Sequence, residues 1–434
     1  MCRKYCLFFI TCIIFSASPA MAETWTIDRT VTTAVEVSNT VALERLDIDL
    51  SYLDAVSARM EWFPKLSFNA GVKYISEVME IKMPFQTIRF GDNDLYDFNI
   101  QFNQLLYDGG RLKAIRDASE KRSLMSANRA KAVALAVEFR AKAAFFGVAI
   151  TEQTLKSSEQ SLLEAKNHLY DVKARFKQGM TLENDVVSAE LRVSQAEMDI
   201  ISHQASLERA KAVFRKITGL GSDEPVTIEW KDKSALFSET PRIETALEKR
   251  PEYKAFNAAI DASKWTARGS SADRRPQISM FGAFNYGKPG LNLPENEWMH
   301  YLSGGVFLKW NILDWGASSR NTEKSFIAMK KTEKQRDDFT RNLAEQFSEA
   351  LSEYAEAEKR QKLSEQAAAF AHRQMELINA AYRAGTATET DYANAHASFT
   401  RATLDKTIST VALRFAEAKI DYVLGIRYNG GKND

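Results

Sequence analysis

The 434-residue sequence predicts an α+β membrane protein in which very long α-helices adjoin four amphipathic β-strands. Three observations lead to this prediction. The chain has no proline between residues 85 and 224 or after residue 294, so helices longer than a compact domain can hold are allowed. Four runs of residues alternate between apolar and polar side chains, which is typical of strands with one apolar face. Landmarks of the first half recur in the second half, which indicates two internal repeats.

The overall composition excludes several classes of protein. Lys and Arg number 58 against 57 Asp and Glu, so the formal net charge is +1 and a nucleic-acid partner is not expected. Hydrophobic residues make up 45% of the chain, which is too apolar for a disordered protein. The three cysteines, Cys2, Cys6 and Cys12, all precede residue 22. No disulfide, thiolate metal cluster or cysteine nucleophile is therefore expected beyond that point.

The N-terminus has the features of an export signal. Arg3 and Lys4 precede an apolar run from Tyr5 to Phe15, and Ala20 and Ala22 are the small residues that a signal peptidase reads. The apolar run of about 11 residues is too short to cross a hydrocarbon core of about 30 Å. We therefore expect residues 1–22 to be a signal peptide that is cleaved near Ala22. No apolar run of 18 residues follows in the sequence, so any membrane attachment is expected to be made by strands.

The repeated landmarks define the expected domains. The pairs that lie 206 residues apart are Asp108 and Asp314, Gly179 and Gly385, Asp185 and Asp391, and Gly219 and Gly425. We expect a first repeat over 23–218, a linker at mid-height over 219–241, a second repeat over 242–425 and a short tail over 426–434.

Each repeat is expected to contain a helix, a β-hairpin and a helical hairpin, in that order. The first helices are predicted over about 28–61 and 242–273, and the helical hairpins over 110–218 and 316–425. The β-hairpins are predicted over 65–107 and 277–313, with the loops 77–93 and 288–298 between their strands. The stretch 110–178 would be a rod of about 100 Å. Its return helix, 181–217, covers only about 55 Å, so pairs of shorter helices are expected to stack end to end beside each long one. The linker is expected to lie outside this wall, with a short strand over 226–230.

The predicted strands have one apolar and one polar face. Their apolar positions are Leu66, Phe68, Ala70, Val72 and Tyr74; Phe98, Ile100 and Phe102; Ile278, Met280, Gly282, Phe284 and Tyr286; and Leu302, Gly304, Val306, Leu308, Trp310 and Ile312. This pattern suits a barrel whose outside meets lipid and whose inside meets water. A soluble sandwich with one solvated face is the alternative, although four strands alone would leave two open edges. Three copies would supply twelve strands, so a closed homotrimer with a barrel of coiled helices is the simplest arrangement.

The sequence has none of the common signatures of an enzyme. No two of the five histidines stand four residues apart on a helix with an intervening glutamate, and no glycine-rich phosphate loop or nucleophile elbow is present. Four of the histidines are expected to face solvent or a lumen. The Asp108-Gly109-Gly110 turn is interpreted as a strand exit. We therefore expect neither catalysis, nor a metal, nor a cofactor.

Taken together, the motifs resemble those of the TolC-type outer-membrane channels of efflux and type I secretion systems. The motifs that carry the resemblance are Arg250-Pro251-Glu252-Tyr253, the Pro-x-(Ile/Leu)-Ser start of each first strand, the Leu-(x)-Asp-(x)-Gly exit of each second strand, and both glycine turns. The resemblance implies a homotrimer with a twelve-stranded barrel in the outer membrane and a helical tunnel in the periplasm. It also implies a passive exit duct for small molecules or proteins, which docks on a periplasmic adaptor and serves an inner-membrane pump or ABC transporter.

The resemblance further implies two groups of site residues. The turns that would contact the adaptor are Gln178, Gly179 and Met180, and Ala384, Gly385 and Thr386. The residues that would line the periplasmic gate are Asp185, Tyr382, Asp391 and Asn394. In these channels a gate arginine and a second aspartate ring help to close the entrance, but those positions here hold Ala387 and Asn394. A closed state would therefore need other contacts.

Alternative interpretations remain for the gate and for the whole chain. Three copies of Asp391 around one axis would attract cations, whereas Asp391 as a solvated residue at a helix N-terminus would not require a pore. A non-porous trimeric coiled-coil structural protein or adhesin is the alternative function, and a periplasmic adaptor is a weaker one. Four amphipathic strands between helices would serve no purpose in a fibre, so the channel is favoured.

Overall fold

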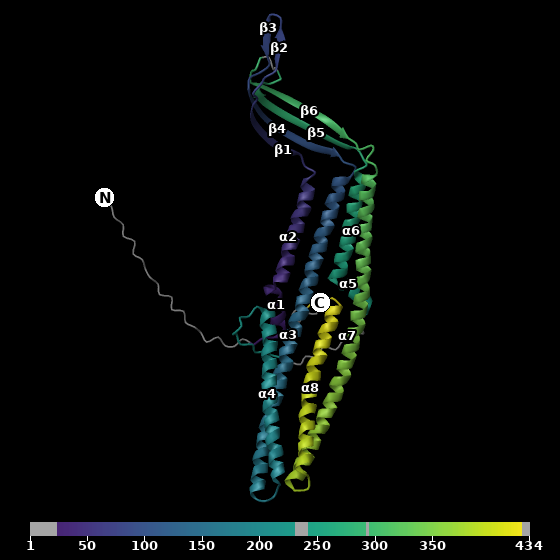
Figure 1. The fold of residues 1–434 in the computed structure, drawn as a ribbon. Coiled ribbons are helices and arrows are strands. Elements are labelled where there is room, and N and C mark those ends of the chain that lie inside the picture. The colour runs from purple at the N-terminus through teal and green to yellow at the C-terminus, as the bar shows by residue number, and fades with distance from the viewer. Residues whose placement is uncertain (1–23, 231–241, 292–294, 428–434) are drawn as a thin grey trace, which may run out of the picture.

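The computed structural model describes residues 24–230, 242–291 and 295–427. A curved sheet lies at one end of a long bundle of helices, and the turns of the helical hairpins lie at the other end (Figure 1). The expected signal peptide 1–22, the second half of the linker (231–241) and most of the tail (428–434) lie outside the described residues.

Two helices run the full height of the bundle. α3 (Arg111–Lys177) and α7 (Ala317–Arg383) each contain 67 residues, which corresponds to about 100 Å. α4 (Glu183–Thr218) returns beside α3, and α8 (Glu389–Val423) returns beside α7, and both end near mid-height (Figure 1). In the other half of the bundle, α2 (Asn39–Met60) and α6 (Pro251–Ala272) pack against the long helices. Shorter helices thus cover both halves of each long helix.

Both predicted first helices are divided by a break. The prediction of one continuous helix over 28–61 is wrong, because α1 (Ile27–Val37) ends at Ser38, whose extended backbone caps α2. The Ser38 hydroxyl accepts a hydrogen bond from the backbone N–H of Val41 at 3.4 Å. The predicted helix 242–273 is likewise split into α5 (Ile243–Lys249) and α6, because Arg250 precedes a proline and adopts an extended conformation with ψ 120°.

The main sheet is antiparallel and has two open edges. Its strand order is β1 (Lys65–Tyr74), β4 (Asp94–Tyr107), β5 (Gln277–Lys288) and β6 (Met299–Lys309). One row across the sheet pairs Phe68 with Ile100, Ile100 with Phe284, and Phe284 with Leu302. The next row contains Asn69, Asn99 and Asn285, and the Asn69 amide donates to Asn99 at 2.8 Å. The sheet therefore has one apolar face and one largely polar face, as alternation requires. The polar face also carries Phe281 and Phe307, whose rings stack with centroids 5.2 Å apart.

Two local predictions about strands are wrong. Residues 77–93 were expected to form only a loop, but β2 (Glu80–Met83) and β3 (Gln86–Arg89) pair as a small hairpin that projects beyond the sheet (Figure 1). An ion pair of 2.6 Å between Arg89 and Glu80 joins the two strands. The predicted strand 226–230 is reduced to an isolated bridge between Trp25 and Ile228. Within the described ranges, this segment pairs with the short stretch before α1 through a single bridge, which is too short to count as a strand.

The turns that follow β4 and β6 cap the N-termini of the two long helices. α3 and α7 begin after Gly110 and Gly316, whose φ values of 91° and 79° favour glycine. The Asp108 carboxylate accepts from the backbone N–H groups of Gly110 at 2.9 Å and Leu112 at 2.6 Å. Asp314 accepts from Gly316 at 3.0 Å in the same way. The Leu-(x)-Asp-(x)-Gly motifs thus satisfy N–H groups that a helix start leaves free.

An apolar core lies at mid-height, where the shorter helices end. Phe214 of α4 is fully buried, and its ring meets that of Trp25 edge-on with centroids 5.4 Å apart. Phe145 and Val148 of α3 and Val411 of α8 belong to the same cluster. This core joins the two helical hairpins to the stretch before α1. In the described part of the chain, none of the helices is long and apolar enough to span a membrane.

Candidate functional site at the helical tip

The two glycine turns form the end of the bundle. Gly179 and Gly385 have φ values of 70° and 75°, and a Cβ at either position would meet no atom within 4 Å. Backbone conformation rather than crowding therefore requires glycine here. All six residues expected to contact an adaptor are exposed on these turns, namely Gln178, Gly179, Met180, Ala384, Gly385 and Thr386.

The two aspartates expected at the gate cap the return helices. Asp391 accepts from the backbone N–H of Thr388 at 2.9 Å and from its hydroxyl at 2.7 Å, and donates its own N–H to that hydroxyl at 3.2 Å. These bonds, first the one from the hydroxyl, lower the pKa of Asp391, so its exposed carboxylate is ionised. Asp185 accepts from Leu182 at 3.1 Å and from the Thr181 hydroxyl. Asn394 is exposed one turn further along α8.

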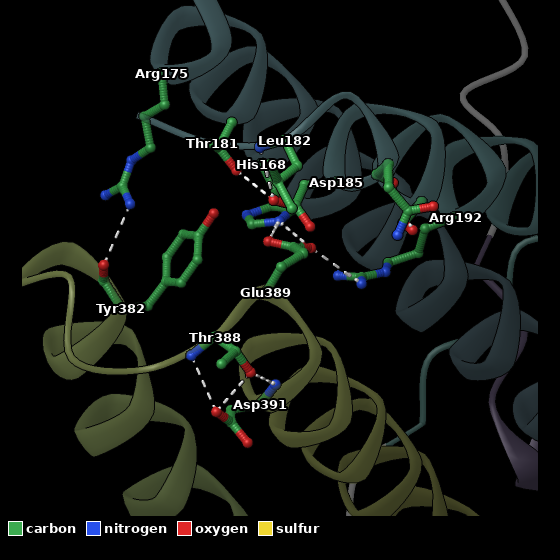
Figure 2. A network of polar contacts seen from close by, with 12 residues as sticks. His168, Arg175, Thr181, Leu182, Asp185, Arg192, Tyr382, Thr388, Glu389 and Asp391 are labelled. Carbon is green, nitrogen blue, oxygen red and sulfur yellow. Dashed lines mark hydrogen bonds and ion pairs between the residues drawn. The ribbon is translucent and has the colours of Figure 1, made fainter. Parts of the chain in front are cut away.

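A buried charge cluster joins the two helical hairpins close to these turns (Figure 2). Glu389, in the first turn of α8, accepts from Nε2 of His168 on α3 at 2.7 and 2.8 Å and from Nη2 of Arg192 on α4 at 3.3 Å. The His168 and Glu389 side chains are only 5% and 9% exposed. A carboxylate accepts hydrogen bonds and an imidazole N–H donates them, so this geometry suits a hydrogen on Nε2 of His168. We call these three residues the inter-hairpin cluster.

Tyr382 borders the inter-hairpin cluster. Its side chain is buried, and the Arg175 guanidinium lies over the ring at 4.5 Å from the centroid. Nη1 of Arg175 also donates to the Tyr382 backbone carbonyl at 3.2 Å (Figure 2). Burial, followed by the charge of Glu389 and a hydrogen bond to it, raises the pKa of Tyr382 to about 12. The phenol is therefore neutral at physiological pH, and Arg175 of the first hairpin clamps a residue of the second.

A second histidine–glutamate pair lies further from the turns. His396 of α8 and Glu164 of α3 are joined through Nε2 at 2.7 Å, and this hydrogen bond lowers the pKa of Glu164. The Tyr392 ring stacks on His168 with centroids 4.1 Å apart, and burial raises the pKa of its phenol. The expectation that four histidines face solvent or a lumen is wrong for His168 and His396, which are buried. Each histidine contacts a carboxylate of the opposite hairpin, and this hydrogen bond offsets the free-energy cost of burying the polar ring.

Of the four expected gate residues, the structure places Tyr382 against the inter-hairpin cluster, while Asp391 bonds to Thr388 at the start of its own helix. The sequence prediction missed His168, Arg192 and Glu389. A signal for them exists, because Glu164 and His168 are four residues apart on α3, and Glu389, Tyr392 and His396 follow the three-four spacing of one face of α8. In the described ranges, no group of three or more His, Cys, Asp or Glu residues could hold a metal ion.

The sequence and the fold both match known proteins. The model of the outer membrane efflux protein family matches residues 33–220 and 242–425. The chain belongs to this family. The resemblance to TolC-type channels stated from the motifs is thereby confirmed. As an outer membrane efflux protein, the chain is located in the outer membrane and is not an enzyme.

Individual relatives are similar at low identity. The outer membrane protein TolC of Vibrio cholerae serotype O1 is 23% identical over 287 residues, which cover 64% of this chain and 63% of TolC. The chain thus spans less than two thirds of the length of this curated relative. The solved structure of CusC matches with a TM-score of 0.80 at 15% identity, over 92% of each chain. VceC of Vibrio cholerae matches with a TM-score of 0.76 at 14% identity, over 92% of this chain and 96% of VceC. These structures show that the fold is shared.

Proposed function

We propose that this outer membrane efflux protein is the passive exit duct of a tripartite efflux pump or a type I secretion system, and that three copies close around a common axis. The observation that carries the proposal is the amphipathic sheet with open edges at β1 and β6, joined directly to a bundle about 100 Å long. An open edge needs a partner, and three sheets joined edge to edge give a barrel of twelve strands.

The side chains of the sheet support a barrel in lipid. On the apolar face the edge strands expose large side chains, with Leu302 82% and Val72 72% exposed. On the other face Asn285 donates to Ser303 at 3.1 Å, beside the Asn69–Asn99 bond. An apolar outside and a polar inside are the arrangement of a membrane barrel. A non-porous coiled-coil fibre gives such a sheet no role.

The proposal includes the two repeats, 23–218 and 242–425, joined by the linker 219–241, and removal of residues 1–22 near Ala22.

The exposed turns are the proposed contacts with partners. Residues 178–180 and 384–386 would meet a periplasmic adaptor, which links the duct to an inner-membrane pump or ABC transporter. The exposure of all six residues and the open space around Gly179 and Gly385 support a docking role.

The inter-hairpin cluster is the proposed lock of the closed gate. Ala387 leaves no gate arginine on the second hairpin, whereas Arg192 and His168 bind Glu389 from the first. The position of Tyr382 against this cluster supports its proposed place in the gate. Asp185 and Asp391 lie in the first turns of the two return helices, and Asn394 lies one turn further along α8. We propose that these three residues line the aperture.

The assembly can be tested on the mature protein in detergent. We expect the molar mass from light scattering to equal three chains, and we expect the protein to form channels in planar bilayers. The chain has no cysteine after residue 22, so Asn69→Cys on β1 combined with Ser303→Cys on β6 should give trimers with a flexible bis-maleimide. Asn99→Cys alone, on the central strand β4, is the control that should stay uncrosslinked. A monomer without conductance would overturn the proposal.

The role of Asp391 is tested separately. We expect Asp391→Asn to lower the cation selectivity of the channel, because it removes three negative charges from the aperture while its amide oxygen can still accept from Thr388. Reversal potentials in a salt gradient provide the measurement. Asp223→Asn in the segment after α4 is the control, since it removes the same charge far from the tip. Unchanged selectivity in Asp391→Asn would place Asp391 outside the pore and leave it as a helix cap only.

A further inference from the structure

A groove with aromatic walls and several cations lies where the bundle meets the sheet. It has a volume of about 660 Å³ and runs between α2 and α3. The side chains that matter for its chemistry are Arg59, Trp62, Phe63, Lys113, Arg116 and Glu120. None of them belongs to the helical tip, so the proposed gate does not account for this groove.

The groove opens on the side of the apolar face of the sheet. Arg111 on α3 shares a separate cavity with Gln277 and Lys309, which pair with each other in the rows of the polar face. Lys113 and Arg116 lie roughly 140° to 200° around the α3 axis from Arg111, because each residue adds about 100°. They therefore point to the opposite side, which is the side of the apolar face. In the proposed assembly that is the lipid side.

The height of the groove matches a membrane interface. Trp62 and Phe63 are 55% and 60% exposed immediately before β1 begins. Trp310, just after β6, donates its indole N–H to the Arg274 carbonyl at 3.1 Å. Exposed aromatic rings at the end of an apolar strand face are typical of the level of lipid headgroups. The groove thus lies where headgroups would meet the protein.

The polar groups of the groove leave positive charge available. Arg59 binds Glu120 through Nε at 3.1 Å and Nη2 at 2.8 Å, and Arg116 binds Asp117 through Nε and Nη2 at 3.0 and 2.8 Å. Nη1 of each guanidinium is not used in these pairs, and each Nη1 has two N–H donors. Lys113 has no ion pair with any described residue. Three groups can therefore donate to a phosphate, and the lysine brings a charge that no carboxylate neutralises.

We propose that this groove binds an anionic glycerophospholipid of the periplasmic leaflet, with the phosphate held by Lys113 and Arg116 and the acyl chains lying on the apolar strand face. The proposal rests on the proposed function, because it takes the apolar face to be the lipid face. The aromatic walls favour a lipid over a free ion, since Trp62 and Phe63 cover the glycerol and the first methylene groups. The site would fix the depth of the sheet in the membrane.

The test uses the assembled mature protein and native mass spectrometry with phosphatidylglycerol as the probe. We expect Lys113→Gln/Arg116→Gln to weaken the binding of phosphatidylglycerol about tenfold or more, since each cation near a lipid headgroup contributes on the order of 1 kcal/mol. Arg111→Gln/Arg122→Gln is the matched control, because it removes two cations from the opposite side of the same helix. We expect it to bind within about twofold of wild type.

Several results would overturn the proposal. An equal loss in both double variants would show general attraction to charge, and equal binding of phosphatidylethanolamine would show no anionic preference. Competition by millimolar inorganic phosphate would show an adventitious ion only. Conductance separates this site from the proposed function. A conducting wild-type trimer without a phosphatidylglycerol preference removes the lipid site and leaves the duct, whereas a wild type that does not conduct removes the duct.

Discussion

Replacing Glu389 by glutamine is expected to release one helical hairpin from the other and to raise channel conductance. The carboxylate is 9% exposed and binds His168 and Arg192 of the first hairpin. Glutamine is neutral and of nearly the same size, so Arg192 would keep its charge in a half-buried site without a counter-ion. Nη1 of Arg192 already has no hydrogen-bond partner among the residues that the structure describes. Loss of one member of a buried ion pair costs on the order of 3 kcal/mol, which shifts the docked equilibrium roughly a hundredfold.

Single-channel recordings in planar bilayers measure this effect, together with hydrogen exchange of the amides around Glu389. Glu190→Gln is the matched control, because Glu190 pairs with Lys173 at 2.8 Å within the first hairpin, where both side chains are about half exposed. Such exposed pairs contribute little, so we expect wild-type conductance. Equal conductance and exchange in Glu389→Gln and wild type would contradict a lock at the inter-hairpin cluster.

Replacing Phe214 by alanine is expected to cause the largest loss of stability. The ring is fully buried in the mid-height core and meets Trp25 edge-on. Its removal leaves a cavity between rigid helices, and Phe-to-Ala changes in cores cost about 3–5 kcal/mol. Because Trp25 lies before α1 and pairs with the segment after α4, we expect this junction to loosen first.

The temperature at which the helical circular dichroism signal is lost, at one fixed scan rate, measures this change. Phe214→Leu refills most of the space and should lose clearly less stability than the alanine variant. Limited proteolysis should cut between Gly219 and Trp230 earlier in Phe214→Ala than in wild type. A midpoint within 1 °C of wild type would mean that Phe214 does not hold the junction, since about 1 kcal/mol shifts a midpoint by a few degrees.

The long elements could be predicted because their signals are local and repeated. α3 and α7 follow from long stretches without proline, and the strands follow from alternation over five to eleven residues. Both helix breaks were missed. The X-Pro step before Pro251 is a local signal from which the break at Arg250 could have been predicted, whereas Ser38 gives no clear signal because serine also occurs inside helices. The hairpin of β2 and β3 has only four residues per strand, so its alternation is too short to distinguish from a loop.

The tip was predictable only in part. Glycine turns and capping aspartates are encoded by neighbours within a few residues, so the locations of Gly179, Gly385 and Asp391 followed from the sequence. Glu389 and His168 lie 221 positions apart in the sequence. The residue pattern of one helix does not reveal which residues of a distant helix will pack against it. The packing of α3 against α8 is needed to show that the polar residues on one face of α3 lie opposite those on one face of α8.

The breaks at Ser38 and Arg250 have a mechanical consequence. Both interrupt the partner helices near mid-height, while α3 and α7 pass this level without a break. Between mid-height and the glycine turns, about 33 residues of α3 form a helical segment about 50 Å long. A tilt of only about 5° at the pivot would carry the turns about 4 Å sideways, so the proposed aperture at the tip would widen while each long helix bends only slightly.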